Sequence, residues 1–153
     1  MAKYYYMDSL APLPTCLHIG TATAIFHRGR VLLDHRRDGD WGLIGGAMEL
    51  GESLEECARR EIWEETGLKV GALRLLGLFS HPTRIIAYEE GDILQSITVC
   101  FAAEASSEVI TLSAESREAR FFSEADLAVV PVVATHRMII PHLFHPEDWP
   151  VIQ

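Results

Sequence analysis

Residues 46–68, GAMELGESLEECARREIWEETGL, contain the most informative pattern in this sequence. Ser53 and Glu56 have the spacing of a capping box, in which the hydroxyl accepts from one backbone N–H and the carboxylate accepts from another. Apolar residues then follow at helical spacing on one face: Leu54, Cys57, Ala58 and Ile62. Gly67 is a typical residue at the end of a helix. The pattern therefore predicts a helix over about residues 54–66.

Acidic residues are concentrated on this helix. Glu61, Glu64 and Glu65 are spaced i, i+3, i+4 and share one face, and Glu52 lies just before the helix. Clustered carboxylates repel one another and raise each other's pKa values. Mg²⁺ or Mn²⁺ would relieve that repulsion, since hard divalent cations prefer carboxylate oxygens. The alternative is a solvated acidic face, partly neutralised by the arginines at positions 59 and 60, and the spacing alone leaves both open.

The whole segment resembles the signature of the Nudix hydrolase family. That signature is Gly, five residues, Glu, seven residues, Arg-Glu, an aliphatic residue, any residue, Glu-Glu, any residue, Gly and an aliphatic residue. Here its positions are filled by Gly46, Glu52, Arg60-Glu61, Ile62, Glu64-Glu65, Gly67 and Leu68. The resemblance implies a mixed α and β fold, an α/β/α sandwich around a mixed sheet, over about residues 17–145.

The resemblance also implies roles for individual residues. The implied metal ligands are Glu61, Glu64, Glu65 and the backbone carbonyl of Gly45. Arg60 is expected to pair with Glu52 and orient the cluster, and Gly46 next to Gly45 allows the backbone to approach the metal closely. One departure is Ile44, where the family often has a proline that shapes the loop.

The implied reaction is metal-assisted hydrolysis, in which water attacks one phosphorus of a P–O–P linkage. The general base is either Glu65 or a glutamate on a later loop. The later candidates are Glu104, Glu108, Glu115 and Glu118. Glu115 is the preferred one of these because it precedes a short strand, where relatives often carry a functional acid. The alternative is a solvated loop carboxylate.

Substrate contacts are less specific in the sequence. Arginine suits phosphate geometry, so Arg36, Arg37 and Arg84 are candidate phosphate contacts, with plain surface arginines as the alternative. Aromatic residues that could stack a base or belong to the core are Trp41, Phe79 and Tyr88. Of the seven histidines, His35 and His81 are the ones expected to line a cleft.

The resemblance narrows the substrate only in part. Pro82 lies 14 residues beyond Leu68, which resembles, with an offset of about one residue, the ADP-ribose-hydrolysing subgroup. A nucleoside diphosphate linked to another group, with ADP-ribose as the leading example, is therefore the expected substrate. The alternatives are a nucleoside triphosphate pyrophosphohydrolase and a non-catalytic module that senses a nucleotide.

Around this segment, alternation of apolar residues predicts a series of strands. They are residues 17–26, 30–36, 73–80, 83–88, 93–103 and 118–122. Ser123 is a candidate cap for a short helix, a second helix is expected within residues 132–144, and Asp38-Gly39 predicts a turn. Residues 1–15 are expected to be irregular because they contain two prolines. We therefore divide the chain into an N-terminal extension, residues 1–16, and a single domain, residues 17–153.

Composition limits the class of protein. The 153 residues are 48% hydrophobic and 23% charged, as in a globular domain, and the formal net charge is −9. That charge disfavours nucleic acid and anionic membranes as partners. Residues 49–65 hold seven glutamates and two arginines, more than half of the acidic excess. A negative chain can still act on a negative nucleotide if cations lie between them.

Cysteine usage and hydropathy suggest the compartment. The three cysteines form no disulfide or metal pattern, and neither a signal peptide nor a membrane span is evident, so a cytoplasmic location is expected. Residues 132–146 are expected to pack either on the sheet or on a second subunit, so a homodimer is among the expected assemblies.

Overall fold

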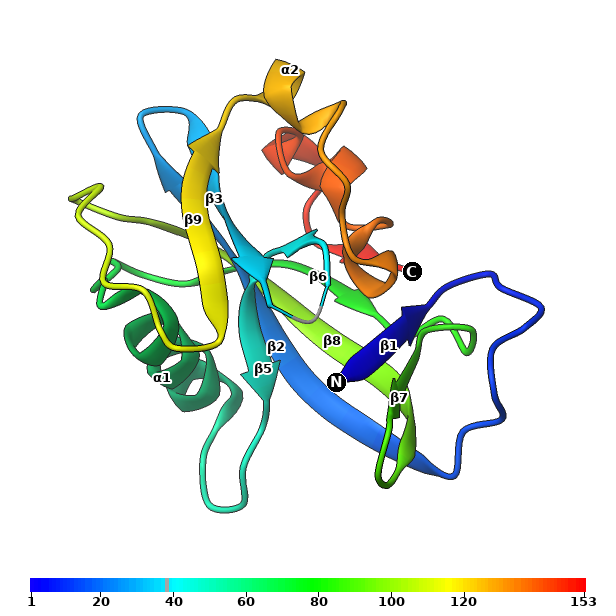
Figure 1. The fold of residues 1–153 in the computed structure, drawn as a ribbon. Helices are drawn as coiled ribbons and strands as arrows, with labels where there is room; N and C mark the ends of the chain where they lie inside the picture. The colour runs from blue at the N-terminus through cyan, green and yellow to red at the C-terminus, as the bar shows by residue number, and fades with distance from the viewer. Residues whose placement is uncertain (38) are drawn as a thin grey trace.

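The computed structural model describes residues 1–37 and 39–153. Figure 1 shows helix α1 on one side of a curved sheet and the C-terminal turns on the other side. The strands are β1 (Ala2–Tyr5), β2 (Cys16–His27), β3 (Arg30–Arg36), β4 (Trp41–Gly42), β5 (Ile44–Ala47), β6 (Arg74–Phe79), β7 (Ile85–Tyr88), β8 (Ile93–Glu104), β9 (Ser116–Phe122) and β10 (Val151–Ile152). The helices are α1 (Leu54–Thr66) and α2 (Glu124–Leu127), with short 3₁₀ turns at Ala134–His136, Ile140–His142 and Pro146–Asp148.

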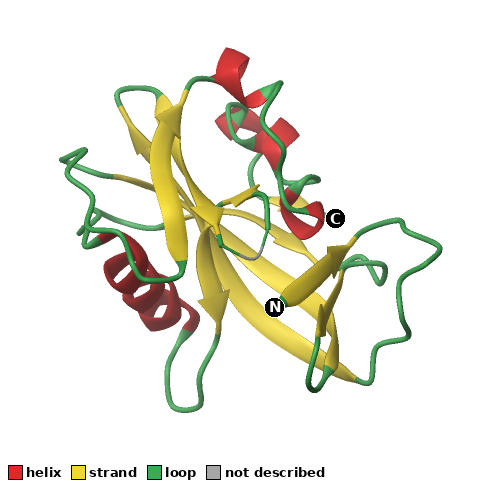
Figure 2. Ribbon diagram, in the orientation of Figure 1, coloured by secondary structure: helices red, strands yellow, loops and turns green. Residues whose placement is uncertain are grey.

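The sheet is mixed. Its main path runs β1-β7-β8-β2-β3-β4, while β5 pairs with β2, β9 with β3, and β6 with both β8 and β10. The two longest strands, β2 and β8, run parallel, and β10 runs parallel to β6; the other pairs are antiparallel. Figure 2 shows how strands dominate the fold. The predicted fold class, mixed α and β around a mixed sheet, is confirmed.

The two faces of the sheet bury two apolar clusters. On β2, Ala22 and Ala24 join the larger cluster under the C-terminal turns, while Ile25 joins the smaller cluster, which contains Ile62 of α1. Strand β3 alternates in the same way, with Leu33 in the larger cluster and Leu32 in the smaller. This period-2 alternation is the reason that both faces carry packed layers.

Helix α1 has the ends that the sequence predicts. Ser53 accepts from the backbone N–H of Glu56, and the Glu56 side chain accepts from the N–H of Ser53, so the capping box is formed. At the other end, Gly67 adopts a left-handed conformation with φ of 67° and donates its N–H to the carbonyl of Trp63. The Ser123 cap of α2 is confirmed in the same way.

Two expectations about secondary structure are wrong, and three short strands were missed. Residues 2–5 form strand β1, paired antiparallel with β7, because the two prolines come later in the segment and leave the first residues free to join the sheet edge. Residues 132–144 form two 3₁₀ turns in place of a helix, with Pro141 within the second, and Val132 makes an isolated bridge with Trp41. Strands β4, β5 and β10 were not expected at all. The expected turn at Asp38-Gly39 includes a residue outside the described ranges.

The C-terminal turns pack on the sheet of their own chain. Met138, Ile139 and Leu143 belong to the larger apolar cluster. Among the described residues, no helix is both long and apolar enough to span a membrane.

Candidate active site

Two glycines of β5 place α1 close to the sheet. A Cβ on Gly46 would lie 2.6 Å from the carboxyl carbon of Glu61, and a Cβ on Gly45 would overlap the carbonyl oxygen of Thr21 on β2. The backbone N–H of Gly45 donates to Glu65 at 3.4 Å. Glu61 therefore lies against backbone that has room for it only because Gly46 has no side chain, and Glu65 lies within hydrogen-bonding distance of Gly45.

Arg60 connects the acidic residues of this segment. Its Nε and Nη2 donate to the two carboxylate oxygens of Glu52 at 3.0 and 2.8 Å. Its Nη1 donates to Glu61 at 2.7 Å and to Glu64 at 3.3 Å. A further bond from Nη2 reaches the carbonyl of Ala47 at 3.0 Å. This forked geometry suits the predicted orienting role of Arg60.

The pKa values differ sharply within the cluster. The hydrogen bonds from Arg60 lower the pKa of Glu52 to about 2. Burial raises the pKa of Glu61, although Arg60 opposes the shift. Burial also raises the pKa of Glu65 to about 8, with Glu61 and Asp34 adding to the shift and Arg36 opposing it.

These shifts separate two environments within the cluster. Arg60 neutralises Glu52, while Glu61 and Glu65 keep raised pKa values beside the two glycines. A cation held between these carboxylates and the glycine backbone would supply the missing charge. The donor set is all oxygen, so the residues present fit a hard divalent cation.

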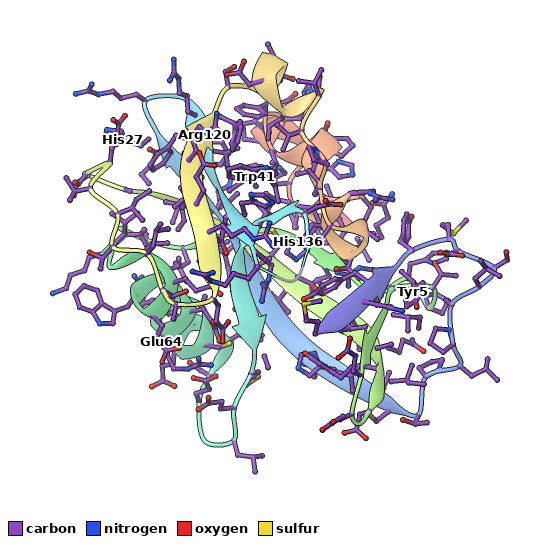
Figure 3. All side chains as sticks on the ribbon, in the orientation of Figure 1. Tyr5, His27, Trp41, Glu64, Arg120 and His136 are labelled. Atoms are coloured by element: carbon purple, nitrogen blue, oxygen red, sulfur yellow. The ribbon has the colours of Figure 1, made fainter. Side chains whose placement is uncertain are left out.

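The three helix glutamates are not gathered into a compact cluster. Within residues 1–37 and 39–153, His145, Glu147 and Asp148 form the only group of three acidic, histidine or cysteine residues whose ligand atoms all lie within 4.8 Å. That group is exposed on the C-terminal turns. Glu64 is more exposed than Glu61 and shares the Arg60 guanidinium with it. Figure 3 shows Glu64 on the outer part of α1. The assignment of Glu61, Glu64, Glu65 and the Gly45 carbonyl as ligands stays a prediction.

Two adjoining cavities lead away from the glycines. The smaller, of about 100 Å³, is lined at one end by Gly45 and Gly46. The larger, of about 470 Å³, is lined by Met1, Tyr4, Arg36, Arg37, Tyr88, Ala114 and Glu115. Both are lined by Tyr4, Arg36 and Tyr88, so the two cavities adjoin at these side chains, and we call them together the cleft.

The structure brings most of the predicted substrate residues to this cleft. Arg36, Arg37 and Tyr88 line it, and so does Glu115. Arg36 is close enough to Glu61 and Glu65 to oppose the rise in the pKa values of both.

The other candidate bases lie elsewhere. Glu104 lines a separate cavity of about 540 Å³ next to Trp149. Glu108 lies 3.7 Å from His27, and Glu118 pairs with Arg120 at 2.9 Å. Glu115 is therefore the one later glutamate of the four expected candidates that reaches the cleft.

Arg84 lies in the interior and not at the cleft. It is fully buried, and its guanidinium donates to three carbonyls and one hydroxyl. The acceptors are the carbonyls of Phe79, Ser96 and Thr135 and the hydroxyl of Thr98, at 2.5 to 2.9 Å. Burial lowers its pKa to about 10. Arg84 thus joins β6, β8 and the C-terminal turns, and we do not retain it as a phosphate contact.

Two of the aromatic candidates belong to the core. Trp41 and Phe79 are buried in the larger apolar cluster, and Trp41 stacks on His35 with ring centres 4.9 Å apart. His81 bonds to Thr83 and not to the site. The histidines that line the cleft are His18 and His136 instead.

Tyr4 also lines the cleft, which the sequence did not predict. It lies on β1, and the register pairs Tyr4 with Ile86 and Ala2 with Tyr88, which places the two tyrosines on the same face of neighbouring strands. The run of three tyrosines at residues 4–6 was the only signal in the sequence.

The NUDIX domain family profile matches residues 17–143. The chain belongs to this family, as the glutamate spacing predicted.

Two curated relatives and one solved structure illustrate the similarity. The chain is 34% identical over 116 residues to an ADP-ribose pyrophosphatase of Methanocaldococcus jannaschii, covering 72% of this chain and 63% of that protein. It is 31% identical over 105 residues to the nucleoside triphosphatase NudI of Escherichia fergusonii, covering 66% and 74%. A MutT protein structure from Bacillus halodurans superposes with a TM-score of 0.64 at 31% identity, covering 84% and 83%. The chain spans between 7% and 63% of the length of the first five curated relatives.

Proposed function

We propose that this protein is a Mg²⁺-dependent pyrophosphohydrolase that cleaves a nucleoside diphosphate linked to a second group. The observation that supports this most is the cleft, which is lined by the two glycines that lie against Glu61 and Glu65 and by aromatic and arginine side chains. Family membership and the relatives named above agree with this reaction class.

Each residue has a role in this proposal. Glu61, Glu64, Glu65 and the Gly45 carbonyl would hold Mg²⁺, for which Mn²⁺ is a plausible substitute. A bound divalent cation polarises phosphoryl oxygens and makes water a better nucleophile at neutral pH. Arg60 keeps Glu52 and Glu61 in place, and Gly46 leaves space for the Glu61 carboxylate.

Arg36 and Arg37 line the larger cavity, where their guanidinium groups would bind the phosphates of a ligand. Tyr88 and Tyr4 offer aromatic surface on which a base could stack. Glu115 would accept the proton of the attacking water, with Glu65 as the alternative base.

The size of the cleft favours an extended ligand. The larger cavity alone, at about 470 Å³, lies in the range of sites that bury a small ligand, roughly 300–1,000 Å³. ADP-ribose is the leading substrate, and the ADP-ribose pyrophosphatase relative supports it. A nucleoside triphosphate is the alternative, supported by the NudI relative. A non-catalytic nucleotide sensor is the third reading, although all the signature carboxylates are present.

A substrate panel tests the proposal directly. Purified protein with Mg²⁺ is incubated with ADP-ribose and with nucleoside triphosphates, and products are separated by chromatography. ADP-ribose should give AMP and ribose 5-phosphate, whereas a triphosphate should give a monophosphate and pyrophosphate. Mg²⁺-dependent binding without turnover of any compound would favour the sensor.

Substitutions on α1 test the ligand assignment. Glu64→Gln and Glu65→Gln should each lower turnover by at least about a hundredfold if the glutamates hold the cation. Glu55→Gln is the matched control, because Glu55 lies on the same helix and pairs with Arg59 at 3.0 Å. Near-normal rates in both test variants would remove the assignment.

The base is tested separately. Glu115→Gln should lower kcat by about a hundredfold or more while leaving KM little changed, because general-base catalysis acts in the transition state. Glu118→Gln is the control, since Glu118 pairs with Arg120 on the same strand. An unchanged kcat for Glu115→Gln would transfer the role to Glu65.

Three further expectations stay predictions. They are a cytoplasmic location, a single domain over residues 17–153 with an N-terminal extension over residues 1–16, and a nucleotide-type partner in place of nucleic acid or membrane. The homodimer is also a prediction.

A further inference from the structure

One face of the sheet is only partly covered. Ile25 on β2 and Ile62 on α1 share the smaller cluster, so the odd-numbered residues of β2 point toward the helix side. The strand register then places six apolar side chains beyond the helix on this same side: Leu17, Ile19, Ile97, Leu75, Leu78 and Ile152. We call this set the open face.

The open face is continuous across four strands. Ile19 on β2 pairs with Ile97 on β8, and Leu78 on β6 pairs with Ile152 on β10. Neighbouring strands lie about 4.8 Å apart, so each of these pairs is a pair of cross-strand neighbours, and Val99, which pairs with Leu78, lies between them on the same side. The opposite side of the sheet is covered by the C-terminal turns, as Figure 1 shows.

These side chains are accessible to an unusual degree for a sheet interior. The exposed fraction is 66% for Leu17, 46% for Ile19 and 79% for Ile152. It is 37% for Leu75 and 36% for Leu78. Together these five residues leave roughly 500 Å² of accessible surface, at the upper end of what monomers usually expose as one apolar patch.

Charge is missing from the open face. Of the other residues that the register places on this side of β2 and β8, the partly exposed ones, Gln95 and Phe101, are uncharged, and the buried ones are Thr21, Thr23, Val99 and Ala103. The chain contains 35 charged residues among 153, so a patch made of the open face, Gln95 and Phe101 carries less charge than the average surface. Depletion of charge is the compositional mark of the centre of a protein interface.

We propose that the open face is the contact surface of a symmetric homodimer of this chain. Two copies placed face to face would bury roughly 1,000 Å² from these side chains, before any contribution from the rim. That area meets the lower limit of about 1,000 Å² for a specific interface. In a dimer with two-fold symmetry, the same patch of each copy contacts the other copy. Two sheets that pack face to face lie about 10 Å apart.

Electrostatics gives the assembly a distinctive salt dependence. Each copy carries a formal charge of −9, so two copies repel one another while their uncharged faces attract. Salt screens the repulsion and leaves the apolar contact in place. The dimer should therefore strengthen as NaCl is added, whereas an assembly held by ion pairs would weaken.

Sedimentation velocity on the full chain tests the proposal. Over about a hundredfold range of concentration, the wild type should shift from the mass of one chain, 17.1 kDa, to twice that mass. Leu17→Lys and Ile152→Lys lie at opposite ends of the open face, and each should keep the protein at the mass of one chain. Val129→Lys is the matched control, because Val129 is 85% exposed beyond α2 and outside the open face.

Several results would overturn the proposal. They are a wild type that stays at the mass of one chain, a dimer that persists in both lysine variants, and loss of the dimer in Val129→Lys. If circular dichroism shows that a lysine variant is unfolded, Leu17→Ser and Ile152→Ser replace it and should still weaken the dimer. None of these measurements requires turnover, so their outcome is independent of the proposed reaction.

Discussion

His136 should make the protein less stable in acid, and replacing it should remove that effect. The ring lies beside the cleft between the sheet and the C-terminal turns, as Figure 3 shows. Its Nδ1 accepts from the backbone N–H of Leu43 at 3.1 Å, so that nitrogen is unprotonated. Burial, with Arg84 and Arg36 adding to it, lowers the pKa of His136 to about 3 from its ordinary value of 6.5.

The size and sign of the effect follow from this pKa. A group whose pKa is lowered in the folded state stabilises the fold above about pH 6.5. That stabilisation is lost as the pH falls toward 3, because the unfolded chain binds the proton first. A pH of 5 lies about 1.5 units below the ordinary histidine pKa of 6.5 and still above the pKa of His136 in the folded state. Proton binding to the unfolded chain therefore lowers the free energy of unfolding by about 2 kcal/mol at that pH. This is an upper limit, since a small part of the residue remains accessible through the cleft.

The perturbation is His136→Asn, which offers Leu43 a carbonyl oxygen but does not titrate. The free energy of unfolding is measured by urea denaturation at about pH 7.5 and pH 5. When the pH is lowered from about 7.5 to 5, the free energy of unfolding of the wild type should fall by about 2 kcal/mol more than that of the variant. Other titrating groups are present in both proteins and cancel in this comparison.

His145→Asn is the control, with the opposite sign. The pKa of His145 is raised, first by its hydrogen bond with Glu147, so protonation stabilises the fold below about pH 6.5. Removing it should make the protein more sensitive to acid. An identical pH dependence in the wild type and His136→Asn would refute the inference that His136 is held neutral.

Three further predictions concern α1 and the cation. Arg60→Lys cannot reproduce the fork to Glu52 and should weaken the apparent Mg²⁺ affinity by about 10- to 100-fold, measured by titrating activity with Mg²⁺. Gly46→Ala should weaken the apparent Mg²⁺ affinity with little change in Tm. The added Cβ would lie 2.6 Å from the flexible Glu61 carboxylate, so that carboxylate must move. A large loss of Tm would contradict this reason. Ser53→Ala should lower the free energy of unfolding by about 1 kcal/mol in urea denaturation, because it removes the helix cap.

Removal of the cation is predicted to act on the reaction and not on the fold. A chelator should abolish turnover, and added Mg²⁺ should restore it. Far-ultraviolet circular dichroism should be unchanged, because the two apolar clusters form without any metal ligand. Turnover that continues after complete chelation would contradict the cation's role.

The sequence by itself determined the acidic helix and its surroundings. The capping box at Ser53, the helix that follows and its end at Gly67 depend on residues within a few positions of one another. Such short-range signals are readable without a fold. The family resemblance rests on the same local spacing, which is why it and the fold class are confirmed.

Only the tertiary structure decided which distant residues share the cleft. Tyr4 reaches it because β1 pairs with β7, more than 80 positions away in the sequence. Arg84 is excluded from it because its guanidinium bonds across 51 positions to Thr135. The open face likewise depends on the register of four strands. Pairing and burial of this kind arise from contacts far apart along the chain, so local patterns could not predict them.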